Sequence, residues 1–381
     1  MGGGVSITHH EAGPARARRR IDDLDEQLIS LLRERKRISA GIQRDRLASG
    51  GVRTDIARER EIFRRYGGVF GSAGTALSSA VLEICRGRLG SERDPVDEDA
   101  AAGFPRIGVF SFLNCGPLRW ALREDGAGGL RETKTGTPER LATALLAGEV
   151  DVAPISLLEY LRHADELLAL PGLAIGSDGP VMSCQLFSRA PLDTLDGRTV
   201  ALGAGSRTAT LLARILLEER FGVTPGYRVE APVLADMLRE SDAAVLIGDA
   251  ALAETLHPRP GLLVHDLGEL WRDWTGLPMV FAVWAVRRSF ADGHADEVRA
   301  VHAALLAASR YGSDNTGAVA EALTDNGIFP KAALRRYFDT LDYTLGEHQL
   351  AGLRHFAKLA ARRGEVPDGA DITLLDLEGE A

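Results

Sequence analysis

The sequence predicts a long amphipathic helix near the start of the chain. Between residues 15 and 47 apolar side chains recur every three or four positions, which places them on one helix face. They are Ile21, Leu24, Leu28, Leu31, Leu32, Ile38 and Ile42. Such a helix is roughly 50 Å long at about 1.5 Å per residue. The shorter helices expected over 54–66 and 73–88 cannot cover this stripe, so the sequence predicts a homodimer formed through the helical region.

Arginines recur along the same helix. Arg35 and Arg46 share a face, because at about 100° per residue they point within roughly 20° of each other. Arg18 points about 100° away from Arg35, so it is better placed to serve the partner's pocket in an antiparallel dimer. A guanidinium grips a carboxylate through two hydrogen bonds and keeps its charge. The set therefore predicts a site for a small dianion.

Three charged residues, Asp55, Arg58 and Glu59, follow a break in the helix at 48–51. Their position after the turn would let this segment close the pocket over the helix. The alternative for any single arginine of the region is an exposed ion pair with an acidic neighbour.

The chain changes character after residue 90. Residues 1–90 carry a net charge of +6, and residues 91–381 carry a net charge of −15. Residues 1–14 are typical of a disordered tail, and the acidic, proline-containing segment 91–104 is typical of a linker. The basic residues belong to the expected helices and form no basic tail, which favours a small anionic ligand over nucleic acid.

Composition also bounds the cellular context. The chain has no apolar run near 20 residues and no apolar core at its start, so we expect neither a membrane span nor a secretory signal. Its three cysteines, Cys85, Cys115 and Cys184, are odd in number and lack metal-site spacing. We therefore expect a cytoplasmic protein without a metal or other cofactor, in which Cys115 and Cys184 belong to the core.

From Arg106 onward short β-rich runs alternate with helical runs. The β-rich runs are RIGVFSF, VDVAPIS, TVALGAG, AAVLIGD and MVFAVWAV. This alternation indicates an α/β domain with a largely parallel sheet, followed by a mostly helical stretch over 290–363.

Polar residues stand where the expected strands begin or end, at the edge where open α/β sheets bind ligands. Ser111 and Asn114 follow the first strand, Ser183 precedes a later one, and Asp249 ends another. A lone asparagine in such a place is also a common turn former. We expect Trp271, Trp274, Trp284 and His265 to be structural.

The sequence GAGSRT links a strand to a helix. Its small residues leave backbone N–H groups free at the helix N-terminus, beside the side chains of Ser206, Arg207 and Thr208. With Gly205 they form a candidate nest for a carboxylate or phosphate. The loop lacks the lysine of a P-loop and is not GxGxxG. The alternative is an ordinary turn whose Ser or Thr caps the helix.

The helical region is similar to the all-helical chorismate mutase family, in its short actinobacterial form. The matching signature is RRRIDDLDEQLISLLRERKRISAGIQRDR…GGVRTDIARERE, with CRGRLG at its end. The resemblance implies an intertwined dimer in which Arg18 serves the other subunit. It further implies that Arg35, Arg46 and Arg58 hold the two carboxylates and the ether oxygen of chorismate, while Glu59 meets the ring hydroxyl.

The implied reaction is the Claisen rearrangement of chorismate to prephenate. It requires a compact substrate conformation and positive charge near the breaking ether bond, and neither a nucleophile nor a metal. Larger family members place a Gln late in the third helix, where this chain has CRGRLG. The departure leaves open a slow mutase that needs an accessory protein, or a domain that only binds its ligand.

The remaining chain, over about 105–365, resembles the chorismate dehydratase family of the futalosine route to menaquinone. The matching stretches are FLNCGPL, GEVDVAPISLLEYL, GPVMSC, VALGAGSRTA, AVLIGDAAL, HDLGELWRDWTGLPMVFAVWA and YFDTLDYTLG. The family implies a fold like that of type 2 periplasmic binding proteins, in which two α/β lobes close over a ligand. Lobe one would comprise 105–195 and 283–381, and lobe two 196–282.

The same resemblance implies that Asn114 and Ser183 lie in the active site and that the loop with Arg207 binds a carboxylate. The reaction removes the C4 hydroxyl and the C3 proton of chorismate and gives 3-[(1-carboxyvinyl)oxy]benzoate and water. No His or Glu in these motifs is an evident base. Our hypothesis is that a substrate carboxylate acts as the base, while Asn114 and Ser183 orient it and polarise the leaving hydroxyl.

The sequence leaves three functions open. In the favoured one, a chorismate dehydratase (a lyase) is fused to a mutase (isomerase) domain that forms the dimer and is either active or regulatory. In the second, the α/β domain takes prephenate from the mutase and releases phenylpyruvate, as cyclohexadienyl dehydratases on the same fold do. In the third, the chain senses chorismate without turnover.

Overall fold

The computed structural model describes residues 20–21, 24–39, 61–62, 65–66, 68–70, 77–78, 81, 105–124, 130, 132–205, 207–324 and 329–377. The chain divides into two compact units, one formed by residues 1–96 and 326–328 and one formed by residues 97–325 and 329–381. In the first unit every described residue is helical. The helix expected over 15–47 is confirmed for residues 20–21 and 24–39, and its remaining residues lie outside the described ones.

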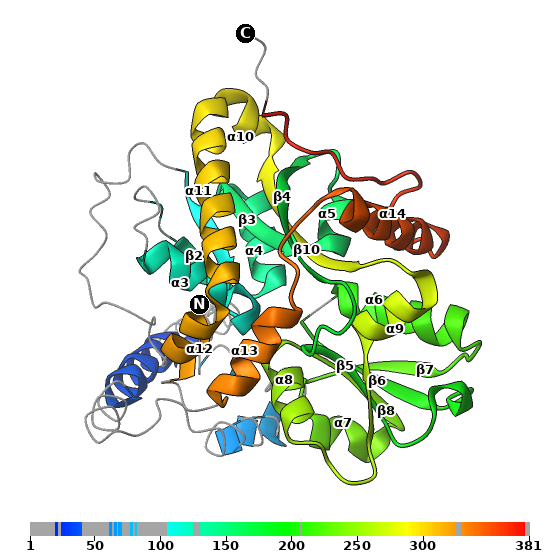
Figure 1. Cartoon of the computed structure of the whole chain (residues 1–381). Coiled ribbons are helices and arrows are strands. Elements are labelled where there is room, and N and C mark those ends of the chain that lie inside the picture. The colour runs from blue at the N-terminus through cyan, green and yellow to red at the C-terminus, as the bar shows by residue number, and fades with distance from the viewer. Residues whose placement is uncertain are drawn as a thin grey trace, which may run out of the picture. The chain divides into compact units, whose positions relative to one another are not determined.

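The second unit contains two five-stranded sheets, which Figure 1 shows as the centres of two lobes. The first sheet has the strand order β2-β1-β3-β10-β4, and the second has the order β7-β6-β8-β5-β9. The strands are β1 (Ile107–Phe110), β2 (Glu132–Gly136), β3 (Val152–Ser156), β4 (Leu167–Ser177), β5 (Cys184–Ser188), β6 (Thr199–Gly203), β7 (Gly226–Glu230), β8 (Ala243–Ile247), β9 (Leu263–Asp266) and β10 (Met279–Arg287).

Both sheets are mixed, whereas the sequence led us to expect a largely parallel sheet. In the first sheet β1 runs parallel to β2 and β3, but β10 runs antiparallel to β3 and β4. In the second sheet β6 runs parallel to β7 and β8, but β5 runs antiparallel to β8 and β9. The antiparallel strands β5 and β10 are those that the chain enters on passing from one lobe to the other.

The chain crosses between the lobes twice, through residues 178–183 and through residues 267–278. The first crossover precedes β5, so residues 184–188 belong to the second sheet and not to lobe one, where we had expected them. The second crossover ends where β10 begins at Met279, slightly before the expected return at 283. The difference arises because β5 pairs with β8 and β9, a choice that its own sequence does not encode.

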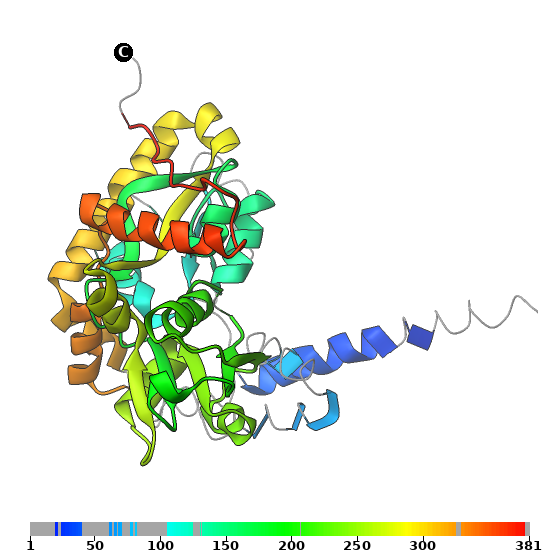
Figure 2. The ribbon, with the colours of Figure 1, turned by 90° about the vertical axis from the view of Figure 1, so that its right-hand side faces the viewer.

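Helices flank both sheets. They are α3 (Gly116–Glu124), α4 (Pro138–Leu146), α5 (Leu157–Arg162), α6 (Arg207–Ile215), α7 (Leu234–Glu240), α8 (Gly248–Leu256), α9 (Leu267–Thr275), α10 (Arg288–Gly293), α11 (Ala295–Asp314), α12 (Thr316–Thr324), α13 (Lys331–Thr340) and α14 (Glu347–Arg362), with a 3-10 turn η1 (Leu113–Cys115) and a π-turn η4 (Leu216–Arg220). Figure 2 shows α14 lying over the first lobe, where it contacts β10. Among the described residues, no helix combines the length and the apolar character needed to cross a bilayer.

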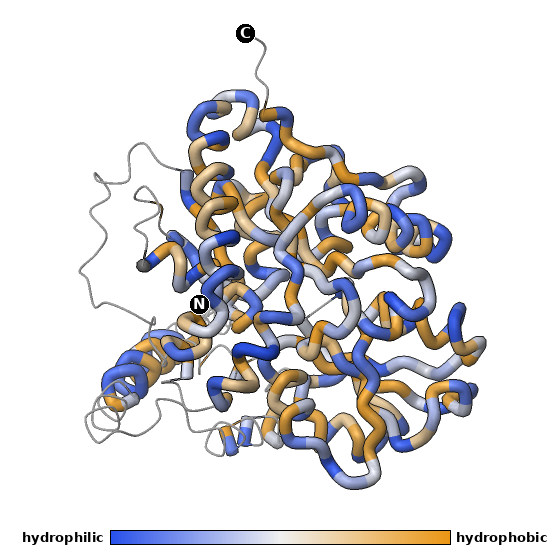
Figure 3. The backbone as a smooth tube through the Cα atoms, in the orientation of Figure 1, coloured by the Kyte–Doolittle hydropathy of each residue, from blue (hydrophilic) through white to orange (hydrophobic). Residues whose placement is uncertain are grey.

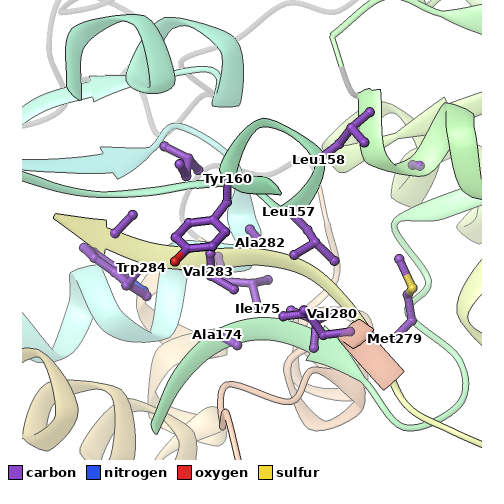
Figure 4. Close-up of a cluster of buried hydrophobic side chains, with 14 of the residues drawn as sticks. Leu157, Leu158, Tyr160, Ala174, Ile175, Met279, Val280, Ala282, Val283 and Trp284 are labelled. Atoms are coloured by element: carbon purple, nitrogen blue, oxygen red, sulfur yellow. The ribbon is translucent and has the colours of Figure 1, made fainter. Parts of the chain in front are cut away.

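The apolar core runs through the strands, as the orange segments inside the tube of Figure 3 show. In lobe one Val280 and Val283 of β10 pack beside Ile175 of β4 (Figure 4), and all three are buried. The expected structural role of the tryptophans is confirmed for Trp271 and Trp284, both of which are buried. This rigid core fixes the strand ends from which the polar loops project.

Candidate active site

The loops that follow β1 and β8 meet between the two sheets. Asp249, at the start of α8, accepts a hydrogen bond from the backbone N–H of Leu113 at 3.0 Å. Beside it Gly248 has φ +64°, and a Cβ built there would lie 3.3 Å from the ring of Phe112. Glycine is required here because a side chain would meet both the strained backbone and the ring. The hydrogen bond between Leu113 and Asp249 connects the Asn114 turn of lobe one to the N-terminus of α8 in lobe two.

Asn114 lies in the η1 turn, directly after β1. Its backbone carbonyl accepts a hydrogen bond from the hydroxyl of Tyr343 at 2.8 Å. Its side-chain oxygen Oδ1 is buried and has no hydrogen-bond partner among the described residues. A buried acceptor without a partner costs free energy unless a ligand or water satisfies it. Asn114 is thus the described site residue with an acceptor left for a bound molecule.

Ser183 lies at the end of the first crossover and is buried, with 5% of its surface exposed. Its hydroxyl lies 3.4 Å from the carbonyl oxygen of Val181, a long and weak contact. Its own carbonyl accepts a hydrogen bond from the N–H of Gly248 at 2.7 Å. Because Gly248 adjoins Asp249, this bond brings Ser183 to the same place as the Asn114 turn.

Tyr337 of α13 completes this cluster. Its buried hydroxyl lies within hydrogen-bonding reach of the Ser183 side chain. Burial raises the pKa of Tyr337 well above its usual value, so the phenol stays neutral and able to donate. Burial likewise raises the pKa of Cys115, to about 12. Burial raises the pKa of the Cys184 thiol too, and the prediction that both cysteines belong to the core is confirmed.

The GAGSRT loop meets the N-terminus of α5 across the lobes. Thr208 is buried, and its hydroxyl oxygen accepts a hydrogen bond from the N–H of Leu158 at 3.1 Å. The guanidinium of Arg207 lies 3.3 Å from a carboxylate oxygen of Glu159 and 3.7 Å from one of Glu139. The Arg207 side chain is 54% exposed, so it remains open to solvent while it bridges the lobes.

The remaining candidate residues are Gly205 and Ser206 of the GAGSRT loop and Ser111 after β1. Gly205 has φ +112°, a conformation that favours glycine, and Ser206 lies outside the described residues. Ser111 is exposed, and its N–H donates to the carbonyl of Gly136. The structure therefore gathers Asn114, Ser183 and Asp249 and leaves Ser111 at the surface.

In the helical unit, Arg35 is the single candidate site residue that the structure describes. Its Nη1 atom donates to the carbonyl of Val81 at 3.5 Å. The other five candidates, Arg18, Arg46, Asp55, Arg58 and Glu59, lie outside the described residues. Most apolar side chains of the helix are exposed, from 42% for Ile29 to 62% for Leu31, while Leu32 is half-buried. Their exposure leaves the predicted stripe open to a partner.

Sequence reasoning gave no role to three residues that shape this site: Tyr337, Tyr343 and Asp266. Both tyrosines belong to the stretch YFDTLDYTLG, which carried part of the resemblance without pointing to a contact. Asp266 accepts hydrogen bonds from the N–H groups of Val181 and Met182, directly before Ser183. His265 is partly buried, burial lowers its pKa, and its Nε2 atom has no hydrogen-bond partner among the described residues.

The two lobes and their shared strand-end site define the class of the second unit. The chain superposes with the periplasmic aliphatic sulphonate binding protein of Escherichia coli at a TM-score of 0.54, with 19% identity, over 73% of this chain and 94% of that one. This likeness shows the fold of type 2 periplasmic binding proteins, as the sequence predicted.

Comparison with protein families gives a narrower result. The model of a menaquinone biosynthesis family matches residues 105–362, and the chain belongs to this family. It is 34% identical over 267 residues to the chorismate dehydratase of Thermus thermophilus, which covers 66% of this chain and 93% of that protein. It is also 30% identical over 237 residues to the 1,4-dihydroxy-6-naphtoate synthase of the same organism, covering 60% of this chain and 83% of that protein.

The N-terminal region has relatives of its own. Over 73 residues the chain is 40% identical to the intracellular chorismate mutase of Mycolicibacterium smegmatis, which covers 19% of this chain and 70% of that protein. Both resemblances inferred from the sequence are confirmed. The chain therefore joins a region related to chorismate mutase to a chorismate dehydratase family domain.

Proposed function

We propose that the second unit is a chorismate dehydratase, which converts chorismate to 3-[(1-carboxyvinyl)oxy]benzoate and water. The observation that carries the proposal is the unpaired, buried Oδ1 of Asn114 in the same cluster as the Ser183 hydroxyl. One family can contain several activities, so the substrate rests on this site and on the dehydratase relative.

The cluster suits loss of water without a strong protein base. Tyr337, Cys115 and Cys184 are held neutral by burial, and Asp249 already accepts the Leu113 N–H. A carboxylate of the substrate then takes the C3 proton, and the C4–O bond breaks as the ring becomes aromatic. The protonated substrate carboxyl gives this proton to the departing oxygen, which leaves as water. Ser183 donates a hydrogen bond to that oxygen, and Asn114 holds the substrate in place. Arg207 binds a substrate carboxylate in place of its present glutamate partners.

For the helical unit we propose a mutase module that binds chorismate and forms a homodimer. The support is its relationship to intracellular chorismate mutases and the exposed apolar face of its helix. Whether it turns chorismate over or only regulates the second unit is decided by the same assay. The expected cytoplasmic location stays a prediction.

The test is to incubate the full chain with chorismate and to follow products by mass and ultraviolet absorption. The proposal requires an aromatic product at the mass of chorismate minus water that keeps the enolpyruvyl group. Prephenate beside it would show an active mutase. Phenylpyruvate without the enolpyruvyl benzoate would instead support the prephenate dehydratase alternative, and binding without any product would support a sensor.

A further inference from the structure

Asp266 is a half-buried carboxylate at the last position of β9, where the chain leaves lobe two. Asp266 caps the N-terminus of α9, because its Oδ1 atom accepts hydrogen bonds from the N–H groups of Gly268 at 2.9 Å and Glu269 at 3.2 Å. Its other contacts reach a different part of the chain.

The second set of donors comes from the segment that precedes Ser183. Oδ2 of Asp266 accepts from the N–H of Met182 at 2.7 Å and from Nε2 of Gln185 at 2.6 Å. The N–H of Val181 lies 3.0 Å from Oδ1 and 3.1 Å from Oδ2. One carboxylate thus satisfies five donors, and Val181 and Met182 are the two residues directly before Ser183.

The backbone at this point needs such an anchor. Met182 has φ +58°, and it is the single residue other than glycine with positive φ in the part of the chain that the structure describes. A bulky side chain rarely adopts this conformation unless the surroundings impose it. The turn at Met182 sets the direction in which the next residue, Ser183, projects its hydroxyl.

Asp266 also joins the two crossovers. Val181 and Met182 belong to the first crossover, and Gly268 and Glu269 belong to the second. The crossovers touch elsewhere too, because a Cβ on Gly268 would lie 2.5 Å from the carbonyl oxygen of Gly179. Arg272 and Asp178 add an ion pair of 2.5 Å between the same segments. The carboxylate therefore lies where both connections between the lobes meet.

We propose that Asp266 is the positioning residue for Ser183: its carboxylate holds the Val181–Met182 turn and fastens it to the second crossover, so that the Ser183 hydroxyl faces the substrate. This inference rests on the proposed dehydratase function for its kinetic consequence. The holding of the turn itself does not depend on the substrate.

The test compares Asp266→Ser with the wild-type full chain. A serine hydroxyl still caps α9 but is too short to reach the Val181 and Met182 amides. We expect hydrogen exchange in peptides covering 180–186 to accelerate at least about tenfold, since exchange reports local opening. We expect kcat for water loss from chorismate to fall at least about tenfold, with KM changed less than about threefold. Combined with Ser183→Ala, the Asp266 change should cost less than about twofold further, because it acts through that hydroxyl.

Two further variants keep the test decisive. Asp266→Asn preserves the size of the side chain and replaces the serine variant if that variant does not fold. Its NH2 group cannot accept a hydrogen bond, so one side of the site loses its acceptor, and we expect the same effects in weaker form. Asp242→Ser is the matched control. Asp242 is a lobe-two carboxylate that accepts a hydrogen bond from the Thr199 N–H at 3.1 Å, and it has no hydrogen bond or ion pair with the segment before Ser183 among the described residues. The control should leave exchange over 180–186 and kcat unchanged.

Unchanged exchange over 180–186 in a folded Asp266 variant would overturn the inference. The inference would also fail if Asp266→Ser lowered kcat as much in Ser183→Ala as in the wild type, because that result would indicate a general structural defect. If the wild-type chain removes no water from chorismate, the proposed function fails, and the exchange measurement alone still decides whether Asp266 holds the turn.

Discussion

The hydroxyl of Tyr343 donates a hydrogen bond to the backbone carbonyl of Asn114 at 2.8 Å, across 229 positions of sequence. Burial raises the pKa of Tyr343 well above its usual value, so the phenol keeps its proton. The bond supports the turn that carries the free amide oxygen of Asn114. It links the C-terminal part of the chain, after α13, to the η1 turn that follows the first strand of lobe one.

Removing this hydroxyl should affect catalysis more than stability. In Tyr343→Phe the Asn114 carbonyl loses its partner, and a hydrogen bond of this kind contributes on the order of 1 kcal/mol. We expect a small drop in the melting temperature and a fall in kcat of about tenfold, because a slightly displaced amide no longer holds the substrate in register. Tyr160→Phe is the control: its hydroxyl bonds the Thr373 carbonyl at 3.1 Å. Equal kcat losses in the two variants would contradict a specific role for Tyr343.

The contact between Tyr337 and Ser183 predicts that Tyr337 affects kcat without its phenol ionising. Tyr337→Phe should lower kcat by about tenfold, because the Ser183 hydroxyl loses the neighbour that orients its proton. Since burial holds the Tyr337 pKa far above its usual value, the alkaline limb of the pH–rate profile should be the same in wild type and variant. A limb that disappears in Tyr337→Phe would show that this phenol titrates during catalysis, against our assignment.

Buried thiols make stability depend on pH. The pKa of Cys115 is raised from 9.0 to about 12, so in the unfolded chain the thiol ionises first. Its contribution to stability is therefore full below about pH 9 and is lost as pH rises from 9 towards 12, at up to about 1.4 kcal/mol per pH unit. Urea unfolding at pH 8 and pH 10 should show a smaller pH dependence for Cys115→Ala than for the wild type. Identical slopes would mean that the thiol is accessible to solvent.

Arg207 should govern affinity for the substrate and contribute little to folding. The side chains of Arg207 and Glu139 are about half exposed and that of Glu159 is 15% exposed, and ion pairs open to solvent stabilise a protein by about 0–1 kcal/mol. Arg207→Ala should leave the melting temperature nearly unchanged and raise KM for chorismate by about tenfold or more, since a charged hydrogen bond to a carboxylate is lost. Arg198→Ala, at an arginine of similar exposure paired with Asp242, is the matched control. An unaltered KM in Arg207→Ala would remove this residue from the site.

Strand and helix periods allowed the α/β class and the strand-end position of Asn114 to be predicted from the sequence. The lobe assignment of β5 could not be, because CQLFS is buried throughout and such a run fits the core of either sheet. Its pairing with β8 and β9 depends on tertiary contacts and not on its own residues.

The supporting residues of the site escaped sequence reasoning for a related reason. Asp266 caps α9, and its bonds to Val181 and Met182 depend on the pairing of β9 with β5, which the sequence does not reveal. Tyr337 and Tyr343 reach Ser183 and Asn114 through the packing of α13 and the segment after it. Periodicity describes which face of an element is buried, and it carries no information about contacts between segments so far apart.

The exposed apolar face of the N-terminal helix yields a prediction for the assembly. Leu28 is 54% exposed, and Leu24 and Leu31 on the same helix are similarly open. Covering such a leucine in a dimer stabilises the complex by about 1.5–3 kcal/mol, so Leu28→Glu should dissociate the homodimer. Sedimentation velocity of the full chain measures the mass directly, and Gln27→Glu adds the same charge at an exposed neighbouring position on the helix. A Leu28→Glu chain that remains dimeric would place the interface elsewhere, and a monomeric wild type would remove the dimer from the proposal. Because the proposed dehydratase site is formed within the second unit, we expect monomeric Leu28→Glu to keep the dehydration and to lose any mutase activity that depends on Arg18 of the other copy.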